Sequence, residues 1–291
     1  MNSKAVFAAV VGGLLLILSS SLKTDMNKLP VCAQFTLDDV EGWERFMGRE
    51  FDPEVWGQRL EMQTRNDCRA NAGTTCLEVL EYRFKRLKAE LSRMFVYQSC
   101  EVIDGRFGAD QGVSVQSGVE LFSEIGAPTE DEYPYSRYTR NRREFNSWCS
   151  VDVMTSAAKR KIIKSSIAPE FKVSVPHVVL GHPVDMASFW PLEFVTEDIG
   201  IGKPVKVCRR YTGRHGSAGH AYAIVFVIRT PRGELLFKVA NSHGYYFYLS
   251  ETAYEQMRDR RQNPFGMYQH AGADDPLAAY YEGQFNIMGV D

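Results

Sequence analysis

One cysteine, one histidine and one asparagine stand in an order that could support thiol chemistry. Cys68, in the stretch QTRNDCRANAG, opens the first long helix that the sequence predicts. A helix N-terminus and a partner imidazole both lower the pKa of a thiol, and an imidazole can accept the thiol proton. Taken alone, a cysteine at a helix start fits a buried structural thiol equally well. The order cysteine, histidine, asparagine at long spacing is what favours a nucleophile.

His220 is the candidate base, because the stretch GHAYAIVFVI places it at the start of a strongly apolar predicted strand. Asn241 ends the next predicted strand, in VANSHG. If the two strands are neighbours, the Asn241 amide can fix the tautomer and orientation of the imidazole. Gln63 could set its side-chain amide beside the backbone N–H of Cys68, and the two donors would then stabilise an oxyanion.

These side chains need two kinds of structure to position them. Amphipathic spacing predicts one helix from Cys68 to about Arg93 and another in VSVQSGVELFSEIG, which Gly126 ends. After about residue 168 the chain is rich in short β-branched and aromatic stretches, among them FKVSVPHVVL, AYAIVFVIRT, ELLFKVANS and YYFYLS. The sequence therefore predicts an α+β protein with a helical part over about 51–165 and a β-rich part over about 166–291.

The composition is that of an ordinary globular protein: 291 residues, 44% hydrophobic and 24% charged, with a net charge of −2. This balance does not point to nucleic acid as a partner. Residues 1–22 are the exception, because a basic start and the apolar run from Ala5 to Leu18 predict a signal peptide or a membrane anchor. The run is shorter than the roughly 20 residues of a full span. We expect a secreted protein or membrane association through residues 5–22, followed by a short lead over 23–50.

The six cysteines and six histidines give no metal signature. No CxxC or Cys/His cluster has the spacing of a zinc site, so neither a metal nor a cofactor is expected. Export would permit disulfides, at most two of them if Cys68 stays free, and their pairing cannot be read from the sequence.

Four ordered blocks resemble the papain-like cysteine peptidases (family C1), in the divergent form seen in bacteria and large viruses. The blocks are CRANAGTTCLE, LSRMFVYQ, DQGVSVQSGVELFSEIGAPTEDEYPYS, and GHAYAIVFV with KVANSHGYYFYL. The resemblance covers roughly residues 50–249. It implies a papain-like fold with the active-site cleft between its helical left part and its β-barrel-like right part. It also implies a thiol protease that hydrolyses a polypeptide substrate through an acyl-enzyme.

By this resemblance Cys68 is the nucleophile and His220 is the base. Asn241 orients the base, and Gln63 donates to the oxyanion. The resemblance implies no metal or cofactor.

Two further positions would meet the substrate. By the same resemblance Gly112 lies in the loop that lines the non-primed side, and Ala221 helps to wall the main specificity pocket. A plain loop glycine and a plain core alanine are the alternative interpretations.

Four positions depart from the family pattern. Gln63 lies one residue closer to the cysteine than the family glutamine does. Arg69 replaces an uncharged residue after the nucleophile, where a cation would lower the thiol pKa and could obstruct the cleft. His243 replaces the tryptophan that shields the histidine–asparagine hydrogen bond, so a wetter bond is expected. Arg65 replaces a cysteine, which removes the familiar disulfide at that point.

Two alternatives stay open. In a shifted register Cys68 matches the earlier family cysteine, Asn71 stands at the nucleophile position and Glu81 takes the place of Glu78. That register predicts a catalytically impaired pseudoprotease that acts as a membrane-associated or secreted binding protein. An acyl or peptide transferase on the same three residues is a further alternative.

Overall fold

The first half of the described chain is helical, and the second half holds the strands together with two helices. The computed structural model describes residues 37–39, 42–214, 217–259, 261–263 and 265–272. Its 3₁₀ helices are η2 (Leu37–Asp39), η3 (Trp43–Met47), η4 (Arg49–Phe51) and η5 (Tyr135–Arg137). Its α-helices are α2 (Pro53–Trp56), α3 (Cys68–Lys85), α4 (Arg93–Ile103), α5 (Val115–Glu124), α6 (Arg142–Trp148), α7 (Val151–Ala158), α8 (Phe171–Leu180) and α9 (Glu251–Arg258). Its strands are β1 (Ile162–Ile167), β2 (Val184–Phe189), β3 (Val195–Asp198), β4 (Pro204–Cys208), β5 (Gly219–Arg229), β6 (Leu235–Asn241), β7 (Tyr245–Leu249) and β8 (Met267–Gly272).

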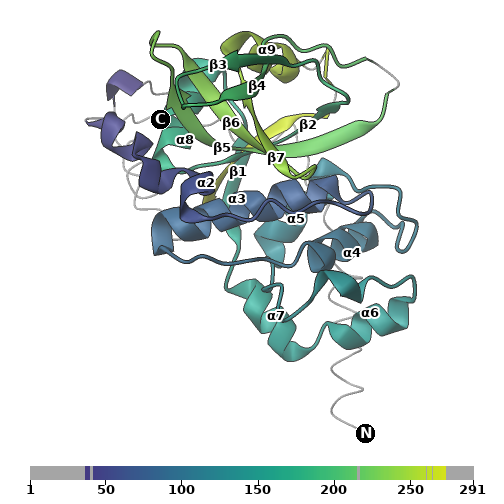
Figure 1. Ribbon diagram of the computed structural model, residues 1–291. Helices are drawn as coiled ribbons and strands as arrows, with labels where there is room; N and C mark the ends of the chain where they lie inside the picture. The colour runs from purple at the N-terminus through teal and green to yellow at the C-terminus, as the bar shows by residue number, and fades with distance from the viewer. Residues whose placement is uncertain (1–36, 40–41, 215–216, 260, 264, 273–291) are drawn as a thin grey trace, which may run out of the picture.

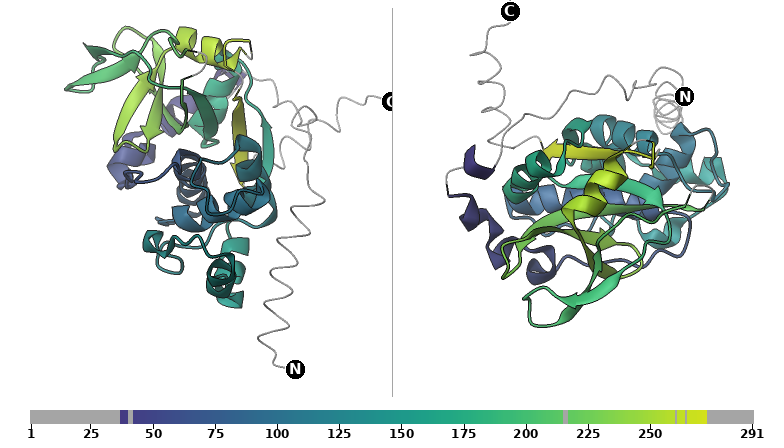
Figure 2. Two further views of the ribbon diagram at one scale, coloured as in Figure 1. Left: turned by 90° about the vertical axis from the view of Figure 1, so that its right-hand side faces the viewer. Right: turned by 90° about the horizontal axis from the view of Figure 1, so that it is seen from above.

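The helices of the first half form a layer separate from most of the sheet. In Figure 1 helices α3 to α7 lie in the lower part of the molecule, and most of the strands lie above them with α8 and α9. The left view of Figure 2 shows the same division from the side. The α+β class predicted from the sequence is confirmed.

The described strands form one eight-stranded sheet in the order β1-β8-β2-β5-β6-β7-β4-β3. Neighbouring strands are antiparallel except β4 and β7, which are parallel. The prediction that the strands carrying His220 and Asn241 are neighbours is confirmed, because β5 pairs with β6. Among the described strands, β1 and β3 form the two edges, so the sheet is open and does not close into a barrel.

Helix α3 packs directly on the sheet and joins the two parts. Its residues Cys76 and Val79 share a buried cluster with Ala223 of β5 and Ala240 of β6. A separate apolar core lies among α3, α4, α5 and α7, and another lies between α8, α9 and the sheet. Since α3 begins at Cys68, the fold places that residue where the two parts meet.

The predicted helix boundaries are right for α5 and wrong for α3. Ser114 caps α5 by accepting from the backbone N–H of Ser117 at 3.0 Å, and Gly126 follows its end with a φ of +88°. Helix α3 ends at Lys85, well before the predicted Arg93, because Arg86 takes the left-handed conformation. Ser92 then caps the new helix α4, a start signal that the apolar periodicity concealed.

The stretch FKVSVPHVVL was predicted to be a strand and is helix α8. Its β-branched residues favour strands on propensity, but packing decides the matter, since every residue of α8 except Lys172 is buried. Gly181, left-handed with a φ of 105°, ends the helix, and Pro183 follows. That pair of stop signals could have corrected the prediction.

The described part of the lead packs against the outside of the sheet. Trp43 of η3 is buried in the core of the β-rich part, and the Arg229 guanidinium lies 4.4 Å from its ring centroid. Lys238, which is 1% exposed on β6, contacts Asp52 at 2.6 Å and Glu54 at 2.8 Å. Residues 42–56 are thus tied to the sheet by an apolar contact and by ion pairs.

The predicted signal or anchor segment, 1–22, lies outside the described residues, as do residues 23–36 of the lead. In the part of the chain that the structure describes, no helix combines the length and the apolar character needed to cross a bilayer. The five described cysteines are all free thiols.

Candidate active site

Cys68 is the first residue of α3 and is half-buried. Ala72, Ala187 and Ala221 form a small buried cluster, and the Cys68 side chain packs against it. The first N–H groups of a helix have no partner within it, so the start of α3 points unpaired donors at this spot. The placement is the one that the sequence predicted for a nucleophile.

His220 and Asn241 are brought together by the pairing of β5 with β6. His220 Nε2 lies 2.9 Å from Asn241 Oδ1. The same oxygen accepts the backbone N–H of His243 at 3.2 Å, which identifies it as the oxygen of the amide. His220 Nε2 must therefore carry the proton and donate it to Asn241. That tautomer leaves Nδ1 of the neutral ring as a proton acceptor.

The hydrogen bond between His220 and Asn241 is buried, contrary to the expectation of a wetter bond. His220 is 5% exposed and Asn241 is 1% exposed. Trp190 packs beside His220, with ring centroids 4.8 Å apart, and the His243 ring stacks on His220 at 4.5 Å. The Trp190 and His243 rings therefore cover the His220–Asn241 hydrogen bond, which lacks the tryptophan of the family pattern.

Burial disfavours the charged forms of both the Cys68 and the His220 side chains. It raises the pKa of the Cys68 thiol, and the neighbouring Asp67 carboxylate raises that pKa further. Hydrogen bonds from the backbone N–H groups of Ala221 and Arg69 oppose this change. Burial also lowers the pKa of His220 to about 4, and the Asn241 hydrogen bond offsets part of that shift. Burial therefore acts against a thiolate–imidazolium pair in the free protein.

Gln63 lies beside the strand that ends in Asn241. Its backbone N–H donates to the Ser242 carbonyl at 2.9 Å, and its Oε1 accepts from the Ser242 hydroxyl. Its amide nitrogen donates to the Arg65 carbonyl at 3.2 Å. A side-chain amide carries two N–H groups, and the Arg65 contact uses one of them.

Gly112 and Ala221 lie close to the cysteine along different segments. A Cβ atom on Gly112, which has a φ of +80°, would lie 3.7 Å from the carbonyl oxygen of Asn66 in the turn before Cys68. Ala221 is 3% exposed and belongs to the cluster against which Cys68 packs. Val115 and Phe265 flank that cluster and make its surroundings apolar.

Arg69 points into the protein, so it does not obstruct the cleft. Its side chain is 2% exposed and forms an ion pair with Asp185 of β2, which is 0% exposed. Gly73 and Gly118 make room for the guanidinium, because a Cβ on Gly118 would lie 2.3 Å from Arg69 Nη2. Asp185 also lies 3.5 Å from Nε2 of the buried His270.

In the shifted register, Asn71 would stand at the nucleophile position. Asn71 is 5% exposed and is held in the interior, where its amide donates to the Asp67 carbonyl at 3.0 Å.

Glu78 is a buried acceptor, bonded by the Leu91 N–H at 2.9 Å and the Gln58 amide at 3.0 Å. Burial raises the pKa of Glu78 to about 7. A cavity of about 160 Å³ adjoins Glu78 and reaches Asn241 from behind.

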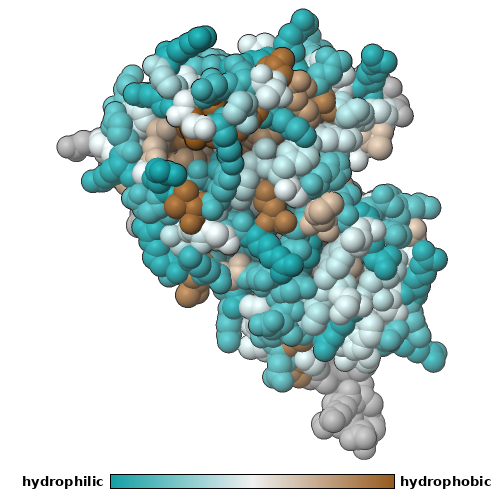
Figure 3. Space-filling model, in the orientation of Figure 1, coloured by the Kyte–Doolittle hydropathy of each residue, from teal (hydrophilic) through white to brown (hydrophobic). Residues whose placement is uncertain are grey.

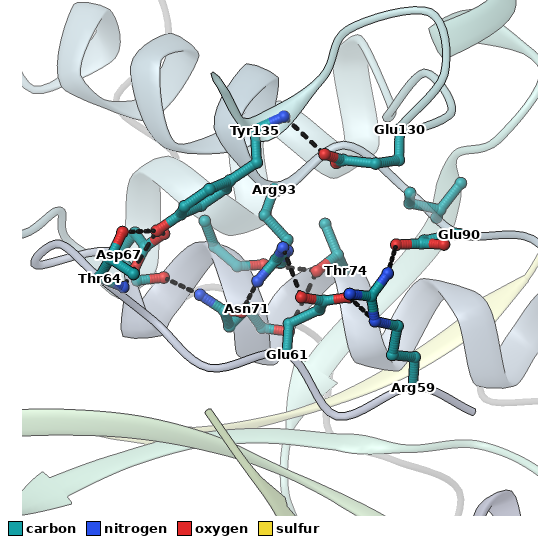
Figure 4. Close-up of polar contacts among 12 residues, drawn as sticks. Arg59, Glu61, Thr64, Asp67, Asn71, Thr74, Glu90, Arg93, Glu130 and Tyr135 are labelled. Carbon is teal, nitrogen blue, oxygen red and sulfur yellow. Dashed lines mark hydrogen bonds and ion pairs between the residues drawn. The ribbon is translucent and has the colours of Figure 1, made fainter. Parts of the chain in front are cut away.

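A polar network behind the start of α3 was not predicted from the sequence (Figure 4). The Tyr135 hydroxyl donates to Asp67 Oδ2 at 2.6 Å. Arg93 donates to Asn71 at 3.1 Å and to Glu61 at 2.9 Å, and its guanidinium lies 4.4 Å from the Tyr135 ring centroid. The network holds Asp67, the residue before Cys68, through the Tyr135 hydroxyl. Only the long-range packing of α4 and η5 brings these groups together.

The surface around these parts is uneven in polarity. In Figure 3 apolar residues gather mainly over the upper, β-rich part, while the helical part is largely hydrophilic. Among the described residues, Met62 is a large exposed apolar side chain, 67% accessible, and its backbone bridges to His243.

Comparison with family models found no match, and comparison with curated protein sequences found none either. Solved structures do match. Xylellain, a cysteine protease from Xylella fastidiosa, has a TM-score of 0.55 at 16% identity over 83% of this chain and 95% of its own. Procathepsin B from Trypanosoma congolense has a TM-score of 0.54 at 14% identity, covering 86% and 84%. The protease and lectin-like part of Cwp84 from Clostridium difficile has a TM-score of 0.51 at 14%, covering 76% and 51%. The chain therefore has the papain-like fold that these cysteine proteases share.

Proposed function

We propose that this protein is a thiol peptidase of the divergent papain-like type, with a polypeptide as its substrate. Cys68 is the nucleophile, His220 the general base and acid, and Asn241 the group that orients His220. The observation that carries the proposal is the buried 2.9 Å contact between His220 Nε2 and Asn241 Oδ1, made at the end of the sheet that faces the start of α3.

The chemistry follows from the tautomer that Asn241 imposes. The Cys68 thiol proton passes to His220 Nδ1 as the sulfur attacks the peptide carbonyl. The negative charge that develops on the carbonyl oxygen is stabilised by the backbone N–H of Cys68 and by the second N–H of the Gln63 amide. The His220 imidazolium then protonates the leaving amine. Water, deprotonated by the same ring, hydrolyses the thioester and restores the thiol.

Substrate contacts are proposed on the apolar side of the cysteine. Ala221, flanked by Val115 and Phe265, would receive an apolar side chain, and the loop at Gly112 would run along the substrate backbone. The absence of a charged side chain among these residues favours an uncharged residue at that substrate position.

A thiol-reactive epoxide followed by peptide mapping tests the proposal. We expect the label on the peptide that contains Cys68 and a large loss of labelling in His220→Ala. Cys208→Ala serves as a matched control, because this buried thiol has its pKa raised to about 12 and should contribute no label. Folded wild-type protein without label on Cys68 would contradict the assignment.

A pseudoprotease is the second candidate, and two observations favour it. Burial disfavours the charged forms of the thiol and the imidazole, and the Gln63 amide already donates to Arg65. Such a protein would bind peptides in the same cleft without labelling at Cys68. Peptide binding that persists in Cys68→Ala while the wild type cleaves nothing would support this candidate.

We also propose export or membrane attachment through residues 5–22, on the strength of the apolar run in the sequence. N-terminal sequencing of the mature protein tests this. A start beyond residue 18 indicates cleavage, and an intact segment in the membrane fraction indicates an anchor. An intact segment in the cytosol would contradict both.

A further inference from the structure

A second imidazole lies directly on His220. The His243 ring is stacked on the His220 ring, with centroids 4.5 Å apart and an interplanar angle of 20°. The backbone N–H of His243 also donates to the Asn241 oxygen that accepts from His220 Nε2. The His220 ring and the His243 backbone thus donate to the same oxygen, and the two rings lie face to face. A charge on either ring therefore changes the electrostatic energy of a charge on the other.

The groups around His243 do not stabilise a positive charge on its ring. The ring is half-buried, and burial lowers the His243 pKa. Its ring neighbours are His220 on β5, Trp190 after β2 and Tyr245 on β7, whose ring centroid lies 6.5 Å away. The Lys206 ammonium of β4 lies 4.0 Å from the Tyr245 centroid, which adds a further positive charge nearby. None of these described neighbours is a carboxylate.

Burial differs between the two rings in a way that orders their titration. His220 is 5% exposed, whereas His243 reaches solvent and can take up a proton directly. A proton on His243 opposes a second one on His220, because two like charges at this separation repel strongly in a partly desolvated site. The catalytic cycle nevertheless requires His220 to become an imidazolium once Cys68 is deprotonated.

We propose that His243 is a positioning residue for His220 that also sets the acid limit of the site, an inference that rests on the proposed function. Neutral His243 holds the His220 ring in the plane that faces Asn241. Protonated His243 opposes the transfer of the Cys68 proton to His220 and so suppresses thiolate formation. The site is therefore active where His243 is neutral and is switched off in acid.

The test is the pH dependence of alkylation of Cys68 by iodoacetamide in the full chain, followed by peptide mapping. In this reaction the sulfur–carbon bond forms, iodide leaves and the thiol proton moves to His220. His243→Phe retains a stacked ring without a titratable charge, so we expect its acid limb to move to lower pH. On that limb its rate should exceed the wild-type rate by about ten-fold, the ratio for one pKa unit. His243→Gln should show the same displacement. Tyr246→Phe, the matched control, removes a hydroxyl on the other face of β7 that has no hydrogen-bond partner among the described residues, and it should keep the wild-type limb.

An unchanged acid limb in His243→Phe, or an equal displacement in Tyr246→Phe, would overturn the inference while leaving the proposed function intact. A wild-type rate in His220→Ala, or no alkylation of wild-type Cys68, would overturn the proposed function and the inference with it. A measurement without variants is the titration of the histidine ring protons by NMR. Coupled titration of His220 and His243 supports the inference, and two independent single-site curves contradict it.

Discussion

Breaking the buried ion pair between Arg69 and Asp185 should be among the most destabilising single changes in this protein. Arg69→Met leaves the Asp185 carboxylate, 0% exposed, without its cation. Among the described residues, Asp185 Oδ1 has no hydrogen-bond partner, and Nε2 of the buried His270 lies 3.5 Å from the other carboxylate oxygen. Removal of one partner from a buried pair costs about 3–5 kcal/mol, because an uncompensated charge stays in the interior. We expect a loss of that size in the free energy of unfolding.

The double variant distinguishes the contribution of the ion pair to stability from the contribution of the volume that the two side chains fill. Arg69→Met with Asp185→Leu removes both charges and leaves apolar side chains, a replacement that is often close to neutral. The double variant should therefore be more stable than either single variant, with a coupling energy of several kcal/mol in the double-mutant cycle. Arg258→Met is the matched control. It breaks the half-exposed pair with Glu255 at 2.8 Å and should cost about 1 kcal/mol or less.

Urea unfolding followed by tryptophan fluorescence measures all four variants under one condition. If each single variant loses less than about 1 kcal/mol of unfolding free energy, the claim that the ion pair is buried is contradicted. Breaking a pair is costly only where the remaining charge stays buried. A double variant that loses the sum of the two single losses would show that the two residues do not interact.

Three further outcomes follow from the charges around α3 and the sheet. Asp67→Asn removes the anion beside Cys68 that raises the thiol pKa, so iodoacetamide should alkylate Cys68 several-fold faster below that pKa; an unchanged rate would contradict this contribution. Burial raises the pKa of Glu78 from its ordinary value of 4.5 to about 7, so the stabilisation from its protonated form is present in acid and is lost as the pH rises from 4.5 to 7. The loss amounts to about 3 kcal/mol, and Glu78→Gln should remove that dependence in urea unfolding at successive pH values; an equal slope in both proteins would contradict it. Asp52→Asn with Glu54→Gln leaves Lys238 as a buried charge and should cost about 3 kcal/mol of unfolding free energy. Lys238→Met should cost less, because the two carboxylates that it leaves behind reach water. The reverse order of the two losses would contradict the burial argument.

The sequence was sufficient where the signals were local. The helix start at Cys68 follows the amphipathic spacing, the α5 boundaries depend on a serine cap and a glycine stop, and the strands of His220 and Asn241 are neighbours through a short connection. Helix α8 was missed because its composition favours a strand and only tertiary packing overrides that preference. In that case the stop signal at Gly181 was present but was outweighed by the apolar pattern.

The structure brings the predicted residues His220 and Asn241 together, whereas the groups that support them were not predicted. Trp190 reaches His220 because β2 pairs with β5 in a register that sets Ser188 opposite His220, and a single sequence does not reveal long-range register. The direction of Arg69 depended on two glycines in different helices that make room for it. Residues that depart from a family pattern were therefore the ones whose surroundings could not be predicted.

Trapping an acyl-enzyme tests most directly the claim that Cys68 is a nucleophile activated by His220. The folded protein is mixed with an activated peptide ester in excess, quenched in acid within one turnover and mapped by mass spectrometry. The account predicts the acyl mass on the peptide containing Cys68, its loss in Cys68→Ala, and much slower formation in His220→Ala. Folded wild-type protein that carries no acyl group on Cys68, or equal acylation in His220→Ala, would contradict it.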